Sequence, residues 1–220
     1  MMNFKNVIFR HLPILLLLGL SSLRVAAADT LLILGDSLSA GFRLPIEQAW
    51  ASQLGDRWKD QPNAPKVINA SISGDTAAQG LARLPELLKT HQPRWVLVEL
   101  GANDGLRGFP TADIERDLTQ IITVIKQANA RPLLMQIRIT PNYGKRYTDA
   151  FTAIYPKLAQ EQNVPLLPYF MEKVVVKPEW MQSDGLHPTA DAQPFIADFM
   201  AQALAPYVGL LQSTTPAKQS

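Results

Sequence analysis

Short apolar runs alternate with longer amphipathic segments from residue 31 to residue 205 of the 220-residue chain. The runs are almost continuously apolar, which is typical of parallel strands that are covered on both faces. They begin at Leu31, Lys66, Arg94, Pro132 and Val164. The segments between and after them have helical periodicity, over 47–58, 77–90, 111–128, 147–162 and 190–205. This order of strands and helices predicts one α/β domain.

The segments between the predicted strands are long enough to cross over a sheet, and such crossovers are almost always right-handed. We therefore expect an open parallel sheet of five strands with helices on both faces. Sheets of this type bind their ligands at the carboxyl ends of the strands. Polar residues that directly follow the predicted strands are accordingly the candidates for chemistry.

The first 27 residues have the features of a secretory signal peptide. Lys5 and Arg10 precede an apolar run over 12–23, and small residues follow it. The run is shorter than the ~20 residues of a membrane span, so an uncleaved anchor is the weaker alternative. Cleavage after Ala27 or Ala28 fits equally well. We take 1–27 as the signal peptide, 28–210 as the folded domain and 211–220 as a flexible polar tail, and we expect no stable membrane anchor after cleavage.

The composition excludes several classes of function. Three of the 21 lysine and arginine residues lie in the predicted signal peptide, which leaves 18 against 19 acidic residues. This near-neutral balance, without a basic patch, argues against nucleic acid as a partner. The chain has no cysteine. It therefore has no disulfide framework, lipoprotein anchor, cysteine nucleophile or thiolate metal site.

The first apolar run ends in the sequence GDSLSAG, which brings Ser37 to the carboxyl end of a predicted strand. The segment lacks the Gly-Lys-Ser/Thr of a phosphate loop and the Gly-x-Gly-x-x-Gly of a dinucleotide fold. It is not a Gly-x-Ser-x-Gly elbow either, because Ser39 occupies the last glycine position. Ser37 is thus a candidate nucleophile. The alternative is that Asp36 and Ser37 only cap the helix that follows.

A hydrolytic serine needs a base that titrates near neutral pH, usually histidine. After the signal peptide the chain has two histidines, and His91 falls in a predicted loop between a helix and a strand. His187 lies three residues after Asp184. This spacing lets the carboxylate hold one ring nitrogen while the other faces a proton to be removed. The alternative is that Asp184 caps a turn and His187 merely precedes a helix starting at Pro188.

Two further strand ends supply hydrogen-bond donors. Gly74 follows the second strand, and Asn103 follows the third. With the backbone N–H of Ser37, they could bind the negative oxygen that forms when a carbonyl is attacked. Glycine and asparagine are also ordinary turn residues. Because these residues and the Asp-x-x-His segment all fall at one edge of the predicted sheet, we interpret them as one site.

The segments GDSLS, ISGDT, GANDG and DGLH resemble, in order, the four sequence blocks of the SGNH or GDSL hydrolases. The resemblance extends over the chain after the signal peptide. It implies a flavodoxin-like three-layer fold, with Ser37 as nucleophile, His187 as base and Asp184 as its orienter. It also implies an oxyanion hole formed by Ser37, Gly74 and Asn103, with no metal or cofactor.

The resemblance further implies a secreted, periplasmic enzyme that cleaves small acyl esters and thioesters, lysophospholipids included, through an acyl-enzyme on Ser37. Candidates for an apolar groove that holds the acyl chain are Leu38, Leu106, Phe109 and Ile139. The segment 105–110 is either a lid over that chain or a plain surface loop. Two alternatives stay open: a carbohydrate acetylesterase of the same fold, and a non-catalytic protein that binds acyl ligands. The sequence does not define the oligomeric state, the physiological substrate or the leaving group.

Overall fold

The sheet is formed by the five apolar runs, and the prediction of a five-stranded parallel sheet is confirmed. In the computed structural model, which describes residues 29–210, the strand order is β2-β1-β3-β4-β5. The strands are β1 (Thr30–Gly35), β2 (Lys66–Asn69), β3 (Trp95–Glu99), β4 (Arg131–Met135) and β5 (Leu166–Leu167). The predicted signal peptide and tail lie outside the described residues.

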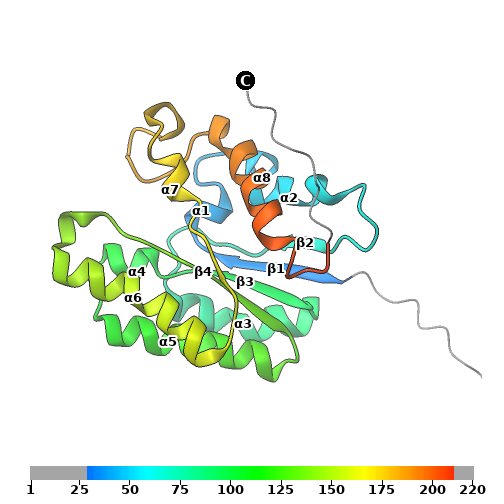
Figure 1. Ribbon diagram of the computed structural model, residues 1–220, viewed down its shortest axis with the longest axis horizontal. Coiled ribbons are helices and arrows are strands. Elements are labelled where there is room, and N and C mark those ends of the chain that lie inside the picture. Colours follow the sequence, from blue (N-terminus) through cyan, green and yellow to red (C-terminus); the bar gives the residue numbers. More distant parts are fainter. Residues whose placement is uncertain (1–28, 211–220) are drawn as a thin grey trace, which may run out of the picture.

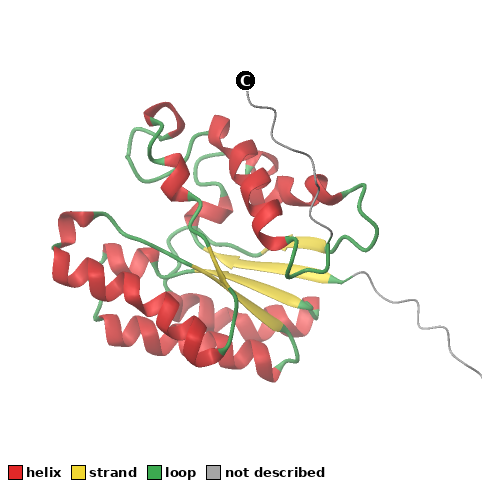
Figure 2. Cartoon of the chain, in the orientation of Figure 1, coloured by secondary structure: helices red, strands yellow, loops and turns green. Residues whose placement is uncertain are grey.

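Five longer helices cover the two faces of the sheet. They are α2 (Trp50–Trp58), α3 (Ala77–His91), α5 (Thr111–Gln127), α6 (Lys145–Gln162) and α8 (Gln193–Leu204). Figure 1 shows α2 and α8 on one face and α3, α5 and α6 on the other, and Figure 2 shows the strands between these two layers. The predicted three-layer α/β fold is therefore confirmed. None of the helices among residues 29–210 has both the length and the apolarity to cross a membrane.

Several short elements escaped prediction, because three to five residues are too few to show a helical period. They are α1 (Ser37–Ala40), α4 (Ala102–Leu106), α7 (Met171–Val174) and the 3₁₀ turns Ile46–Gln48, Pro141–Tyr143, Pro178–Trp180 and Ala190–Ala192. Three predicted helix starts were wrong. The helix α6 begins at Lys145, two residues before the predicted start at residue 147. The backbone of Ala49 is extended, so α2 begins at Trp50 and not at residue 47. The segment Ala190–Ala192 is a separate 3₁₀ turn before α8.

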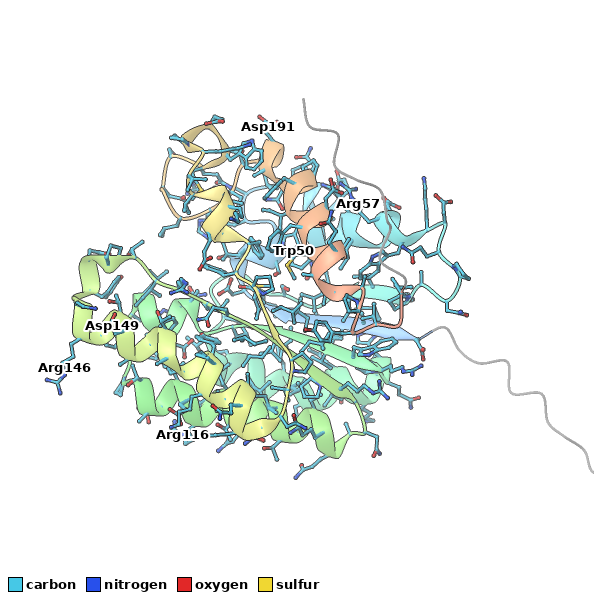
Figure 3. All side chains as sticks on the ribbon, in the orientation of Figure 1. Trp50, Arg57, Arg116, Arg146, Asp149 and Asp191 are labelled. Carbon is cyan, nitrogen blue, oxygen red and sulfur yellow. The ribbon has the colours of Figure 1, made fainter. Side chains whose placement is uncertain are left out.

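The core lies on both sides of β1 and β3. Leu31 to Leu34 of β1 are completely buried, as a strand between two helical layers requires. Trp50 fills the layer under α2 and α8 (Figure 3), and its indole N–H donates to the carbonyl of Leu38 at 3.2 Å. On the other face, the hydroxyl of the buried Tyr155 donates to the carbonyl of Leu100 at 3.0 Å. These bonds satisfy the polar ends of two large aromatic side chains.

The carboxyl ends of β1, β2 and β3 meet at one edge. Gly35 is in register with Glu99, and Ile33 with Asn69. The chain moves to one side of β1 to form β2 and then to the other side to form β3, so this edge is the switch point at which such sheets bind ligands. The predicted candidate residues on the segments after these three strands are therefore brought close together.

Candidate active site

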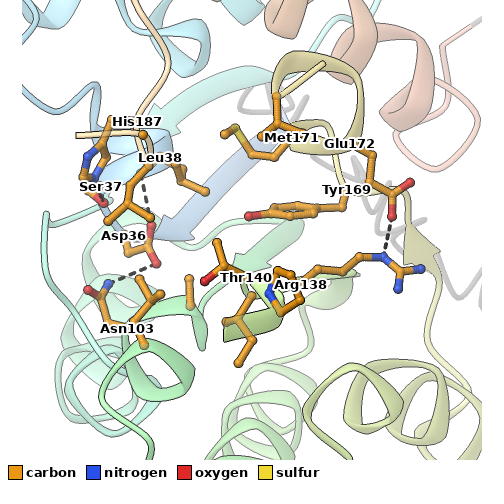
Figure 4. Close-up of a pocket in the computed structure, with 17 residues that line it drawn as sticks. Asp36, Ser37, Leu38, Asn103, Arg138, Thr140, Tyr169, Met171, Glu172 and His187 are labelled. Carbon is orange, nitrogen blue, oxygen red and sulfur yellow. Dashed lines mark hydrogen bonds and ion pairs between the residues drawn. The ribbon is translucent and has the colours of Figure 1, made fainter. Parts of the chain in front are cut away.

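Ser37 lies at the first position of α1, directly beyond the end of β1. The carboxylate of Asp36 caps this helix by accepting the N–H of Leu38 at 3.1 Å. Ser37 is consequently not needed as a cap, and its Oγ lies 2.8 Å from Nε2 of His187 (Figure 4). The capping interpretation was thus correct for Asp36, while the serine side chain contacts the predicted base.

Asp184 uses its two carboxylate oxygens for two different purposes. Oδ1 accepts the backbone N–H groups of Leu186 at 2.9 Å and His187 at 3.0 Å, which closes the turn. Oδ2 lies 2.8 Å from Nδ1 of His187. Burial opposes ionisation of Asp184, but these hydrogen bonds from Leu186 and His187 outweigh it and lower the pKa of Asp184 to about 2. An ionised carboxylate can only accept, so Nδ1 carries the proton and Nε2 presents its lone pair to Ser37.

The turn that carries His187 is fastened to the rest of the site by two residues that the sequence did not single out. Gln182 donates from Nε2 to the carbonyls of Phe42 at 3.0 Å and Pro188 at 2.9 Å. The ring of Phe42 packs against the imidazole, with 4.3 Å between the ring centroids. These contacts hold the imidazole on the side of Ser37.

The two other predicted oxyanion donors lie on the adjoining segments. Gly74 has φ +88°, a conformation that favours glycine, and a Cβ placed there would meet no atom within 4 Å. Asn103 donates from Nδ2 to the backbone carbonyl of Asp75 at 3.0 Å and to Oδ2 of Asp36 at 3.2 Å. Both amide hydrogens are engaged, so a substrate oxygen must displace one of these acceptors, and the longer bond to Asp36 is the weaker one.

A pair of buried carboxyl groups lies behind the nucleophile. Oε2 of Glu99 accepts the hydroxyl of Ser39 at 2.7 Å and the N–H of Asp36 at 3.3 Å, while its Oε1 has no hydrogen-bond partner among residues 29–210. Burial raises the pKa of Asp36 to about 7, and burial together with the nearby Asp36 raises the pKa of Glu99 well above its usual range. This pair could not be predicted from the sequence, because Glu99 continues an apolar strand.

An apolar cavity of about 460 Å³ opens beside Ser37 (Figure 4). Its walls come from the segments after β1, β3, β4 and β5 and from the turn of His187. The lining residues are Asp36, Ser37, Leu38, Ala102, Asn103, Leu106, Arg138, Ile139, Thr140, Pro141, Tyr169, Met171, Glu172, Val175, Gly185, Leu186 and His187.

Three of the four predicted groove residues, Leu38, Leu106 and Ile139, line this cavity. Phe109 does not line it, and 40% of its side chain is exposed. Gly74 lies outside the lining as well. The side chains after β4 and β5 were missed, because nothing in the short segment around β5 separates wall residues from core residues.

The segment 105–110 begins inside a helix and is packed at its start. A Cβ on Gly105 would come within 2.8 Å of both Ile139 and Phe151, so this glycine permits close packing. Farther along, Nη2 of Arg107 donates to the carbonyl of Gly74 at 3.0 Å. The segment is thereby tied to the residue whose N–H is a predicted oxyanion donor. His91 ends α3 and takes no part in the cavity.

A serine hydroxyl bonded to a histidine that a carboxylate holds, beside a neutral amide donor and an apolar cavity, defines the class of serine acyl hydrolases. In the part of the chain that the structure describes, no three histidine or acidic side chains gather as a metal site would require.

Comparison with known proteins identifies the family to which the chain belongs. The model of the GDSL-like lipase/acylhydrolase family matches residues 33–193, and the chain belongs to this family. The resemblance inferred from the four sequence blocks is therefore confirmed.

The chain is 64% identical, over 94% of its length and 98% of the relative's, to thioesterase 1/protease 1/lysophospholipase L1 of Escherichia coli (strain K12). It is 56% identical to an arylesterase of Vibrio mimicus, over 83% of this chain and 91% of the relative. Among solved structures, the chain resembles the psychrotrophic esterase EstA from Pseudoalteromonas sp., in a structure inhibited by monoethylphosphonate, with a TM-score of 0.80 and 42% sequence identity. The match covers 82% of this chain and 99% of the EstA chain. The protein is accordingly an ester hydrolase.

Proposed function

We propose that this protein cleaves acyl esters and thioesters through an acyl-enzyme on Ser37, with His187 as general base and Asp184 as its orienter. The observation that carries the proposal is the unbroken series of hydrogen bonds from Asp184 through His187 to Ser37, which ends at the mouth of an apolar cavity. A protein that only bound acyl ligands would have no use for a histidine aligned in this way.

In the first half-reaction, Nε2 of His187 takes the proton of Ser37 while Oγ attacks the acyl carbonyl. The carbonyl oxygen becomes negative and is bound by the N–H groups of Ser37 and Gly74 and by the amide of Asn103. The intermediate collapses when the protonated His187 gives its proton to the leaving alcohol or thiol. Asp184 stabilises the imidazolium through its bond to Nδ1.

In the second half-reaction, water takes the place of the leaving group. His187 removes a proton from the water, whose oxygen attacks the acyl-enzyme, and the same three donors bind the second oxyanion. Return of the proton to Oγ of Ser37 releases the carboxylic acid. The bond that forms is from the acyl carbon to the water oxygen, and the bond that breaks is from the acyl carbon to Ser37.

The walls of the cavity favour acyl chains longer than acetyl. Leu106, Ile139, Met171 and Val175 extend the lining away from Ser37, and 460 Å³ exceeds what an acetyl group needs. The E. coli relative is named a thioesterase and lysophospholipase. Small acyl esters and thioesters, including lysophospholipids, are therefore the proposed substrates. The predicted signal peptide supports a periplasmic location for this activity.

The test is hydrolysis of p-nitrophenyl esters from acetyl to dodecanoyl by the protein lacking residues 1–27, with Ser37→Ala as the blank. We expect a serine-dependent rate that rises toward medium or long chains. A rate confined to acetyl would instead indicate a short-chain acetylesterase. Absence of both turnover and fluorophosphonate labelling of Ser37 would indicate a binding protein.

A further inference from the structure

Arg83 on α3 holds three chain segments at the edge of the sheet where the site lies. Its Nε donates to Oδ2 of Asp75 at 2.7 Å and its Nη2 to the carbonyl of Gly35 at 3.3 Å. Its Nη1 donates to the carbonyl of Ala70. One guanidinium thus joins the end of β1, the segment after β2 and the loop that carries Gly74. Its side chain is only 20% exposed, so these bonds are largely shielded from water.

Asp75 connects this guanidinium to Asn103. Its side chain accepts from Arg83, while its backbone carbonyl accepts the amide of Asn103 at 3.0 Å. The position of the amide therefore depends on where the Asp75 peptide is held. Asp75 directly follows Gly74 in the chain, so a displacement of Asp75 would move both predicted oxyanion donors together.

The side chain of Asp75 also needs a positive charge beside it. It is only 9% exposed, and its Oδ2 accepts from the guanidinium of Arg83. Arg83 pairs with Asp75 and offsets its charge. Without Arg83, Asp75 would be a buried carboxylate with no cation bonded to it, which strongly favours a rearrangement of the loop.

We propose that Arg83 is a positioning residue of the oxyanion hole: it fixes Asp75 so that Gly74 and Asn103 point their N–H groups to the place where the oxyanion forms. This inference rests on the proposed function. Arg83 does not line the cavity and does not touch substrate. It acts on the transition state through the Asp75 peptide, so its loss should lower kcat and leave KM nearly unchanged.

A matched control is available in Arg57. This arginine is 25% exposed and donates from Nε to Asp198 at 2.8 Å and from Nη2 to the carbonyl of Pro194 at 3.4 Å. It joins α2 to α8 on the other face of the sheet (Figure 3). Arg57→Met and Arg83→Met each remove one aspartate bridge and bonds to backbone carbonyls. Arg83→Met should lower thermal stability more than Arg57→Met, because Asp75 is 9% exposed and Asp198 is 61% exposed. At a temperature where both variants stay folded, only Arg83→Met should slow turnover.

Arg83→Met should lower kcat by ~10- to 100-fold. This loss is smaller than the ~10²–10³-fold that follows removal of a donor, because here the donors are displaced and not removed. KM should change by less than about threefold. Arg83→Lys keeps the charge and loses the fork geometry, so its kcat should fall between those of the parent and Arg83→Met. In the double variant with Asn103→Ala, the effect of Arg83→Met should be smaller than in the parent, because one of the two donors that it positions is gone.

Two results would overturn the inference: a kcat for Arg83→Met no lower than that for Arg57→Met, or effects of Arg83→Met and Asn103→Ala that simply multiply. If Arg83→Met does not fold, Arg83→Lys takes its place in the same cycle and the same criteria apply. A parent without Ser37-dependent turnover refutes both the proposed function and this inference. An active parent with an unaffected Arg83 variant refutes the inference alone.

Discussion

Replacing Asp184 by asparagine should abolish the base while leaving the turn intact. The asparagine oxygen can keep the two bonds to the N–H groups of Leu186 and His187. Its NH₂ group then takes the place of Oδ2, 2.8 Å from Nδ1 of His187. A donor at that position requires Nδ1 to accept, which moves the ring proton to Nε2. The nitrogen that faces Ser37 would then carry a proton and could not remove another.

The size of the effect follows from the tautomer. The same exchange of a donor for an acceptor beside a catalytic histidine costs about 10⁴-fold in kcat, or roughly 5.5 kcal/mol in activation free energy. Asp184 does not line the cavity, so KM should stay within a few-fold of the parent value. Asp184→Ala imposes no donor on Nδ1. It should therefore retain more activity than Asp184→Asn, although it loses both turn bonds and should melt at a lower temperature.

The assay is steady-state hydrolysis of p-nitrophenyl butyrate at pH 8, with melting temperatures measured on the same preparations. Asp184→Asn should melt below the parent at pH 7 and approach it near pH 2, because asparagine lacks the ionised form that the fold stabilises. The folded protein holds the pKa of Asp184 at about 2, below its ordinary value, so its contribution to stability is present above pH 4 and is lost as the pH falls toward 2. A kcat for Asp184→Asn within tenfold of the parent, or above that of Asp184→Ala, would refute the tautomer reasoning.

Three further predictions concern the surroundings of the nucleophile. Asn103→Ala should lower turnover on p-nitrophenyl esters by ~10²-fold or more with less change in KM, and a loss of only a few-fold would remove Asn103 from the oxyanion hole. Burial raises the pKa of Glu99, and it raises the pKa of Asp36 to about 7. The folded state therefore binds more protons than the unfolded state between about pH 4 and pH 7. The free energy of unfolding should fall as the pH rises through this range. Glu99→Gln should make the free energy of unfolding, measured by urea titration at pH 5, 7 and 9, fall less steeply with pH. An equally steep fall in parent and variant would contradict this prediction. Gly101→Ala should destabilise the fold by about 2–5 kcal/mol in the same assay, because φ of residue 101 is +111° and the new Cβ would lie 2.2 Å from the hydroxyl of Tyr155. An unchanged urea midpoint would contradict this prediction.

The sheet and the site blocks could be predicted because each has a strong local signal. Continuous apolar runs mark the strands, and a polar residue directly after a run marks its functional end. Ser37 and Asn103 belong to this type, whereas the Asp184–His187 pair lies well beyond β5 and is recognised by its own spacing. The parallel topology then brings them to one edge without any knowledge of side-chain packing.

The rest depended on packing that no local pattern records. Glu99 continues an apolar strand, and Arg83 is one charge on an amphipathic helix, where charged residues ordinarily face solvent. The cavity wall around Met171 follows a strand of two residues and a helix of four, too short for periodicity. Phe109 was assigned to the groove because it is large and apolar near the site, but it is 40% exposed and lies outside the cavity lining.

The division of the sheet between chemistry and shape has a consequence for how such a protein can diversify. The proposed nucleophile and oxyanion donors follow β1, β2 and β3, whereas Arg138 to Pro141 and Tyr169 to Val175, on the segments after β4 and β5, supply much of the cavity wall. Insertions or exchanges in those two segments can therefore remodel the space for a substrate without moving a reacting atom. A lineage of such proteins can acquire new substrates by small, separable steps while its reaction stays the same.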